Sequence, residues 1–232
     1  MISDNLIAYW RLDESSGNAS DSVGSRTATN TSVTYATGKI GNGAVFNGTS
    51  STMSFSAFTT LTTTFSINCW VNFSGVTGNQ IFFMAGTSGA GAIYISRMNA
   101  SGNLTFTEQA VADYDSGTVL PATGWNMVTV VKNGDGANNL TQYINGVQTA
   151  TTNSVGSVAA GAGTGYFGSF NGTSNWFNGT LDEVGVWTKA LSQLEISQLY
   201  ADGGGSQYQL FESKKEVFME TRQMFATNWK QG

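Results

Sequence analysis

Six Asn-Gly dipeptides recur along the chain, and they constrain its fold more than any other feature. They begin at positions 42, 47, 133, 145, 171 and 178. Asn and Gly both tolerate the positive φ angles that the two central residues of a type I′ hairpin turn require. Between the dipeptides lie short runs in which apolar and polar residues alternate, as they do in half-buried strands. The pattern predicts an all-β protein built from antiparallel hairpins.

The runs between these turns predict where the strands lie. A strand begins at Leu6 and runs into a turn. Further strands are expected over residues 81–84, 92–97, 104–107, 125–132, 141–145 and 181–187. With 232 residues the chain can form one large all-β domain, or one domain with an appendage. A β-propeller would show a repeat of about 40–50 residues, and the sequence has none. We therefore expect a two-sheet antiparallel jelly-roll sandwich.

The composition excludes several classes of function. The formal net charge is −5 and only 11% of residues are charged, so no basic stripe is present to bind nucleic acid. The sequence contains no run of about 18 apolar residues, which is the length that a membrane-spanning helix needs. The chain has no histidine, which rules out a Ser-His-Asp triad, a histidine general base and a histidine-bound zinc. The single cysteine, Cys69, shares one strand face with Phe65, Ile67 and Val71 and is expected in the core.

The segment from residue 171 to residue 200 combines a turn, a strand and a helix. Asn178-Gly179 is expected to form the turn, and residues 181–187 the strand. Ser192 is placed to cap a helix, and Glu195 follows three residues later, as in a capping box. A helix is therefore predicted at the end of the β-rich part of the chain.

This order of elements resembles the closing segment of the laminin-G-like branch of the concanavalin A-like lectin/glucanase superfamily. The resemblance rests on Phe177, Gly179, Leu181, Asp182, Glu183, Val186, Trp187, Ala190, Leu191, Ser192, Glu195, Ile196 and Leu199. Earlier motifs similar to those of the family follow in order at residues 6–17, 21–24, 38–48, 65–71, 124–131 and 140–147. The resemblance implies a laminin-G-like sandwich over residues 1–203 and a glycan-binding or adhesion module.

The resemblance also implies calcium as a cofactor. In the family a calcium often bridges the first-strand loop and the strand with the Asp-Glu pair, and calcium prefers carboxylate and carbonyl oxygens. The corresponding positions are Asp21 and Asp182, with Asp13 and Asn47 as weaker candidates. The alternative is structural. Asp21 would then cap a turn, and Asp182 would accept hydrogen bonds from neighbouring backbone amides.

A glycan site would need exposed aromatic rings with amides nearby. Trp176, Tyr166, Phe170 and Asn175 lie in a Gly-rich stretch that could form such a rim. The alternative is that these rings belong to the core. Three other tryptophans lie in strand patterns and are expected to be buried, namely Trp70, Trp125 and Trp187.

Catalysis is not expected. Glycoside hydrolases need two carboxylates on either side of the scissile bond. Asp113 and Asp115 have the spacing that would place both on one strand face, but their surroundings predict a loop and a third acid is missing. Asp182 and Glu183 are adjacent, so on a regular strand they would point to opposite faces.

The composition changes after residue 203. Residues 207–232 hold 7 of the 25 charged residues, and large apolar residues recur every seven positions. Four of them lie on one face of a predicted helix, namely Phe211, Phe218, Phe225 and Trp229. We expect residues 204–232 to form a glycine hinge and a helical tail for docking or oligomerisation. The alternative is a terminal helix packed back on its own domain.

Together these features predict a non-catalytic structural protein of a virion, such as a bacteriophage head-decoration, fibre or tail subunit, with a glycan-binding module. The support is a Met start without a visible export signal, a composition poor in charge, and a separate tail. The expected partners are other virion proteins or a second copy through the tail, and a cell-surface glycan. The alternative is a secreted, extracellular lectin-like module, and a third reading is a degenerate glycoside hydrolase.

Overall fold

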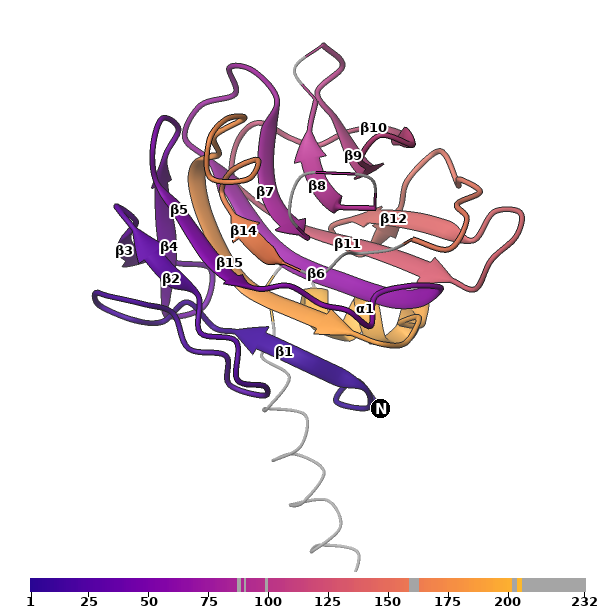
Figure 1. The fold of residues 1–232 in the computed structure, drawn as a ribbon, viewed down its shortest axis with the longest axis horizontal. Coiled ribbons are helices and arrows are strands. Elements are labelled where there is room, and N and C mark those ends of the chain that lie inside the picture. Colours follow the sequence, from indigo (N-terminus) through magenta and orange to yellow (C-terminus); the bar gives the residue numbers. More distant parts are fainter. Residues whose placement is uncertain (87–88, 90, 99, 159–162, 202–203, 206–232) are drawn as a thin grey trace, which may run out of the picture.

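The computed structural model describes residues 1–86, 89, 91–98, 100–158, 163–201 and 204–205. Within these residues the chain forms two antiparallel β-sheets that pack face to face, with one short helix (Figure 1). The predicted jelly-roll sandwich is thereby confirmed. The predicted assembly helix with Phe211, Phe218, Phe225 and Trp229 lies outside the described residues.

The first sheet has eight strands. Seven follow the order β13-β12-β11-β6-β15-β4-β3, and β1 pairs with the second half of β15. Because β4 pairs with the first half of β15, the first strand of the chain and β4 lie on the same side of β15. The strands are β1 Leu6–Trp10, β3 Thr34–Thr37, β4 Asn42–Asn47, β6 Thr64–Phe73, β11 Trp125–Asn133, β12 Leu140–Ile144, β13 Val147–Gln148 and β15 Asn178–Trp187.

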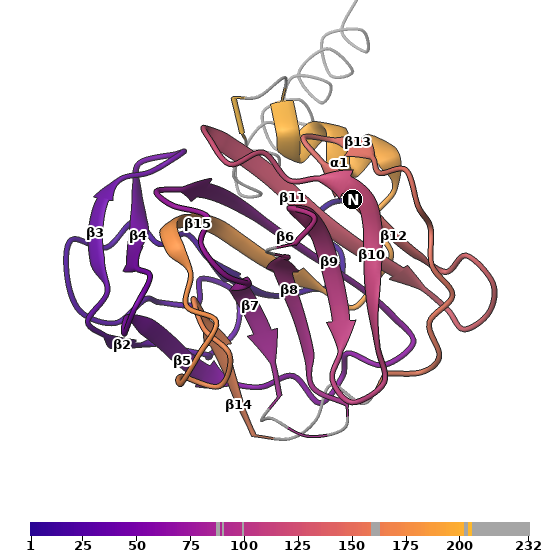
Figure 2. The same ribbon diagram turned by 90° about the horizontal axis from the view of Figure 1, so that it is seen from above.

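The second sheet has seven strands in the order β10-β9-β8-β7-β14-β5-β2. Figure 2 shows β7, β8, β9 and β10 side by side, in front of the strands of the first sheet. The face of the second sheet that is turned away from the first sheet is called the outer face below. The strands are β2 Thr29–Thr31, β5 Thr52–Ser56, β7 Gln80–Ala85, β8 Ile93–Arg97, β9 Asn103–Glu108, β10 Ala112–Val119 and β14 Thr164–Phe167.

Aromatic rings fill much of the space between the sheets. The centroid of the Trp10 ring lies 5.0 Å from that of Phe55 and 5.1 Å from that of Phe167. The indole N–H of Trp10 donates a hydrogen bond to the carbonyl oxygen of Arg26 at 2.7 Å. The one polar atom of this fully buried ring is therefore satisfied inside the core.

Strand β6 is buried on both faces. Phe65, Ile67, Cys69 and Val71 face the core between the sheets, as their alternation predicts. Trp70 packs on the opposite face of the first sheet, away from that core. Burial raises the pKa of the Cys69 thiol, so this side chain stays neutral and acts as a small apolar core residue.

The predicted helix is present as α1, Gln193–Tyr200. Ser192 caps it, because its Oγ accepts the N–H of Glu195 at 3.3 Å while the Glu195 carboxylate accepts the N–H of Ser192 at 2.9 Å. The predicted capping box is thus confirmed. No helix in the described part of the chain is long and apolar enough to cross a membrane.

Helix α1 covers the side of the first sheet that faces away from the second. Its buried residues Ile196 and Leu199 belong to an apolar cluster with Trp70 and Trp187. Tyr200 stacks on Trp70 with ring centroids 5.8 Å apart and an angle of 18°. Trp70 and Trp187 are buried as predicted, but beneath the helix rather than between the sheets, while Trp125 is only partly buried there.

Two of the six Asn-Gly dipeptides have positive φ at both residues, namely Asn145-Gly146 and Asn171-Gly172. The predicted turn at Asn178-Gly179 is wrong, because both residues lie in β15 and pair with β4. A Cβ atom at Gly179 would lie 2.3 Å from the carbonyl oxygen of Asn72. Glycine is needed at this position for close approach of two strands and not for a turn.

Candidate functional site

One row of side chains crosses the outer face of the second sheet from edge to edge. Each member is paired in register with the next, through all seven strands. Side chains at paired positions lie on the same face of a sheet, about 4.5–5.5 Å apart. From β10 to β2 the row reads Asp113, Thr107, Tyr94, Met84, Tyr166, Ser54 and Thr29.

Three aromatic side chains gather over the middle of this row. Tyr94, Tyr166 and Phe170 are half-buried and pack on a small apolar base that includes Met84. The rings of Tyr94 and Phe170 meet edge to face, with centroids 5.8 Å apart and an angle of 85°. We call these three residues the aromatic cluster. Its half-exposed rings can pack against a flat apolar patch of a ligand.

A tight turn fixes Phe170 in the cluster. The N–H of Thr173 donates to the carbonyl oxygen of Phe170 at 3.0 Å, around the Asn171-Gly172 pair. The backbone N–H of Asn171 also lies 3.3 Å from the sulfur of Met84. The turn that carries Phe170 is therefore anchored on the strand below it, and the ring itself packs against Tyr94.

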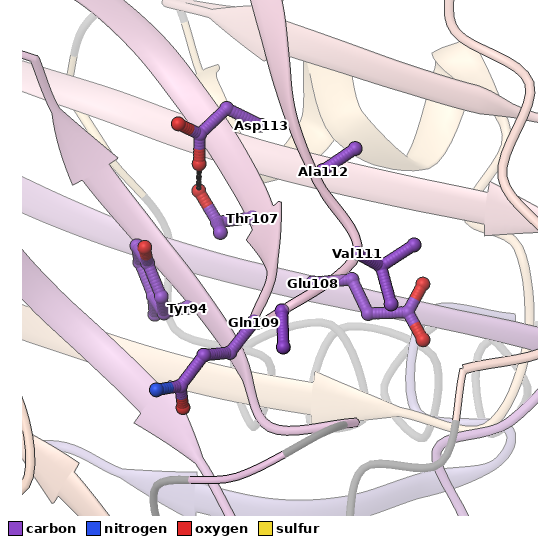
Figure 3. A pocket seen from close by; sticks show the side chains of 8 residues that line it. Tyr94, Thr107, Glu108, Gln109, Val111, Ala112 and Asp113 are labelled. Carbon is purple, nitrogen blue, oxygen red and sulfur yellow. Dashed lines mark hydrogen bonds between the residues drawn. The ribbon is translucent and has the colours of Figure 1, made fainter.

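A depression of about 290 Å³ opens beside the cluster at the β10 end of the row. Figure 3 shows Tyr94, Thr107, Gln109 and Asp113 around it. The Thr107 hydroxyl donates to Asp113 Oδ1 at 2.6 Å. Gln109 Oε1 accepts the N–H of Gly89 at 3.0 Å, which orients the amide. Aromatic, hydroxyl, amide and carboxylate groups thus converge on one hollow.

A carboxylate sets the electrostatic character of this hollow. The pKa of Tyr94 is raised, mainly by burial and also by the negative charge of Asp113, while a hydrogen bond to Thr107 acts in the opposite direction. Tyr94 therefore stays a neutral hydroxyl that can donate or accept. Burial also raises the pKa of Glu108, although the charge of Lys132 opposes the shift.

The outer face carries a second, hydroxyl-lined depression of about 250 Å³ at its other end. Thr29 and Ser54, the last two members of the row, lie in it. The remaining lining residues are Thr27, Phe55, Ser56, Gly163 and Thr164.

The chain matches the sequence model of a known protein family. The family model Laminin_G_3, described as the concanavalin A-like lectin/glucanases superfamily, matches residues 46–197, which is more than half of the chain. The chain belongs to this family. No curated protein matches it in sequence.

Solved structures of other proteins share the fold of this chain. Domain 4 of AbnA, an extracellular arabinanase from Geobacillus stearothermophilus in complex with arabinotriose, is 24% identical with a TM-score of 0.68, covering 84% of this chain and 97% of that one. The binding domain of Paraclostridial Mosquitocidal Protein 1 is 17% identical with a TM-score of 0.68, covering 86% of this chain and 52% of that chain.

Trypanosoma rangeli sialidase in complex with sialic acid is a third similar structure. It is 14% identical with a TM-score of 0.65, covering 88% of this chain. This concanavalin A-like chain spans 34% of the sialidase chain.

The structure brings together two of the four side chains predicted for a glycan site. Tyr166 and Phe170 lie in the aromatic cluster. Asn175 is exposed, and its carbonyl oxygen accepts the N–H of Ile81 at 3.0 Å. Trp176 is half-buried on the same connection and is not part of the cluster.

Sequence reasoning missed Tyr94, although a signal for it exists. Tyr94 alternates with Ile93 and Ile95, which face the core, so it must lie on the opposite face of its strand. The alternation indicates an outward-facing ring, but it does not show which side chains of other strands lie beside that ring.

The predicted loop around Asp113 and Asp115 is wrong. Both residues lie on the edge strand β10 and share the outer face, because they pair with alternate residues of β9. Asp115 accepts hydrogen bonds from the Asn103 side-chain amide at 2.9 Å and from the N–H of Gly117 at 2.7 Å. Pairing with β9 builds this strand despite residues that rarely form strands.

Two of the predicted calcium ligands serve separate turns. Asp21 Oδ1 accepts the N–H groups of Tyr9 and Gly24, each at 2.9 Å. Asn47 Oδ1 accepts the N–H of Ser50 at 2.9 Å, among other groups of its turn. Asp21 therefore caps a turn, as the alternative to a calcium site predicts, and Asn47 caps a turn as well.

The other two predicted ligands meet at the turn formed by residues 38–42. Asp182 Oδ2 accepts the N–H groups of Lys39 at 2.7 Å and Ile40 at 3.0 Å, while Asp13 Oδ1 accepts that of Asn42 at 2.9 Å. In the described part of the chain, no group of three or more His, Cys, Asp and Glu side chains is arranged to hold a metal. Calcium binding stays a prediction.

Proposed function

We propose that the outer face of the second sheet binds a glycan and does not cleave it. The observation that carries the proposal is the aromatic cluster beside the depression that contains Thr107 and Asp113. Sugar rings present flat C–H patches that pack on aromatic side chains, and their hydroxyl groups need polar partners close by. The aromatic cluster offers the aromatic side chains, and the depression offers the polar partners.

The polar groups of the depression suit a polyhydroxylated ligand. Asp113 Oδ1 accepts from Thr107, whereas Asp113 Oδ2 makes no hydrogen bond to another described residue. That oxygen can accept a charge-assisted hydrogen bond from a ligand hydroxyl. The Gln109 amide uses its oxygen toward Gly89 and can present its N–H groups to the same ligand.

The absence of cleavage is part of the proposal. A general acid in a glycosidase is usually a carboxyl group sheltered from water, whereas Asp113 and Asp115 are both exposed. Asp115 is also held by hydrogen bonds from Asn103 and Gly117. These features support a site that binds without turnover.

A glycan array, followed by reducing-end assays on every bound sugar, tests this proposal. Arabinotriose is a suitable first probe, because a similar domain was solved with it. Bound sugar should be recovered intact. Release of reducing ends that disappears in Asp113→Asn would show that the site is catalytic, and an array without any bound glycan would refute the binding function.

We further propose that the module acts within a larger assembly, as a virion subunit. The support comes from the sequence, which is poor in charge over most of its length and changes composition in residues 207–232. Negative-stain microscopy tests it, since a virion subunit should form discrete oligomers or particles. A monomer would favour the alternative, a secreted lectin-like module.

A further inference from the structure

We infer that the depression beside the aromatic cluster selects neutral glycans over anionic ones, and that Asp113 sets this selectivity. The inference rests on the proposed glycan-binding function and concerns its specificity. It begins from the charges that line the outer face. Among the described residues that line either depression, none is Lys or Arg, whereas Asp113 and Glu108 line the depression beside the cluster.

Asp113 is the carboxylate that a ligand would meet. It is exposed, it lies in the same cross-sheet row as Tyr94, and its Oδ2 atom makes no hydrogen bond to another described residue. Its charge is felt across the hollow, since it contributes to the raised pKa of Tyr94. Figure 3 shows the Glu108 carboxylate directed away from Asp113 and Tyr94.

The nearby cations are engaged elsewhere. The Lys132 side chain is fully buried, and its Nζ donates to backbone carbonyls and pairs with Asp135 at 2.9 Å. Its charge acts on Glu108. Arg97 donates to the carbonyl oxygen of Leu120 at 3.1 Å. Among the described residues, therefore, no cation at the hollow balances the charge of Asp113.

An unbalanced carboxylate discriminates between ligands by sign of charge. It accepts hydrogen bonds from the hydroxyl groups of a neutral sugar, but it repels the carboxylate of a sialic or uronic acid. At a separation of about 4 Å the repulsion in water is about 1 kcal/mol and larger near a protein surface, which corresponds to a discrimination of at least about fivefold. Salt should weaken it.

The test uses the full chain and an array of glycan pairs in which only one member is acidic. Suitable pairs are lactose and 3′-sialyllactose, which adds one sialic acid residue, and galactotetraose and tetragalacturonic acid, in which each of the four residues carries a carboxylate. Dissociation constants for bound pairs are then measured at low and high salt. We expect the neutral member of each pair to bind at least about fivefold more tightly at low salt, with the gap narrowing at high salt.

Asp113→Asn keeps an oxygen that can accept from Thr107 but removes the charge. It should reduce the discrimination to about twofold or less, because the repulsion is gone. Asp115→Asn is the matched control on the same strand face, and it should leave most of the discrimination in place. Circular dichroism confirms that both variants fold.

The outcomes separate the inference from the function beneath it. Anionic members that bind as tightly as their neutral partners would overturn the selectivity and leave glycan binding intact. Discrimination that survives Asp113→Asn unchanged would remove Asp113 from this role. If no glycan binds at all, the proposed function fails and the inference fails with it.

Discussion

The Oδ2 atom of Asp182 accepts the backbone N–H of Lys39 at 2.7 Å, across 143 positions of sequence. This contact, with a second to Ile40, closes the turn that leads into β4. Asp182 is fully buried, and burial raises its pKa from 3.8 to about 7, although three backbone N–H groups favour the charged form. A buried carboxyl group that titrates near neutral pH links the stability of the domain to pH.

We therefore predict that stability falls as the pH rises. In the unfolded chain this carboxyl titrates near pH 4, so between about pH 4 and 7 the folded state holds a proton that the unfolded state has lost. The stabilisation is fully present below about pH 4 and is lost as the pH rises through the folded pKa near 7. A few kcal/mol are involved, since one pKa unit corresponds to about 1.4 kcal/mol.

Urea denaturation of the wild type and of Asp182→Asn at pH 4.5 and pH 7.5 measures this contribution. Asp182→Asn should lose the pH-dependent part of the free energy of unfolding that Asp182 supplies. At low pH the variant should also be about 1–3 kcal/mol less stable than the wild type, because an amide N–H₂ cannot accept from the backbone donors. Asp115→Asn, an exposed change, serves as control. Equal pH dependence in wild type and Asp182→Asn would show that Asp182 is not the titrating group.

The sequence could predict strands that carry their own pattern. β11 and β12 alternate apolar and polar residues and appear within one residue of their predicted bounds, and the capping box at Ser192 predicts α1 correctly. β10 lacks apolar alternation, with Asp113, Ser116 and Gly117 along it. It is a strand because β9 pairs with it, and single-sequence propensity carries no information about such a partner.

Only part of the candidate site could be predicted from the sequence, for a related reason. Tyr166 and Phe170 lie four positions apart, so they could be grouped from the sequence alone. Tyr94 and Asp113 join them through the register of β8, β9 and β10, which only the folded sheet defines. The environment of Asp182 likewise depends on a bulge, where Glu183 has a φ of 52° and the pairing with β6 shifts.

The aromatic cluster predicts a specific loss of glycan binding. Phe170→Ala removes a half-exposed ring from a turn whose backbone bonds remain, so the fold should persist. Aromatic contacts of this kind contribute about 0.5–1.5 kcal/mol beyond burial, which corresponds to about a two- to tenfold weaker dissociation constant. Titration calorimetry with a glycan that binds on the array measures it.

Trp176→Ala is the matched control for Phe170→Ala. It lies on the same connection but outside the cluster, so it should change the dissociation constant by less than about twofold. A loss as large as that of Phe170→Ala would move the site along the connection, toward the rim predicted from the sequence. Melting temperatures of both variants separate a binding effect from unfolding.

Calcium gives a third prediction. If the chain binds it, a hundredfold excess over the dissociation constant should stabilise the fold by about 2.7 kcal/mol through mass action. Thermal melts in calcium and in chelator measure the gain, and Asp182→Asn should abolish it. Equal melting temperatures in the two conditions would show that the domain does not bind calcium.

The last prediction concerns residues 206–232. On a helix, Phe211, Phe218, Phe225 and Trp229 would share one face, and burial against a partner would stabilise the assembly by roughly 1.5–3 kcal/mol for each side chain before ordering costs. Truncation should follow Gly205, because its N–H donates to the carbonyl oxygen of Tyr200 at the end of α1.

The truncated chain should keep its melting temperature and lose self-association or docking, as measured by analytical ultracentrifugation. Its β-sandwich should remain folded, since the core cluster between the sheets is built from residues up to Val186. A full-length variant with Phe218→Ser and Phe225→Ser serves as control for the length change, and it should lose assembly as well. If the truncated chain unfolds, the tail stabilises its own domain, and the alternative of a helix packed back on the sandwich is correct.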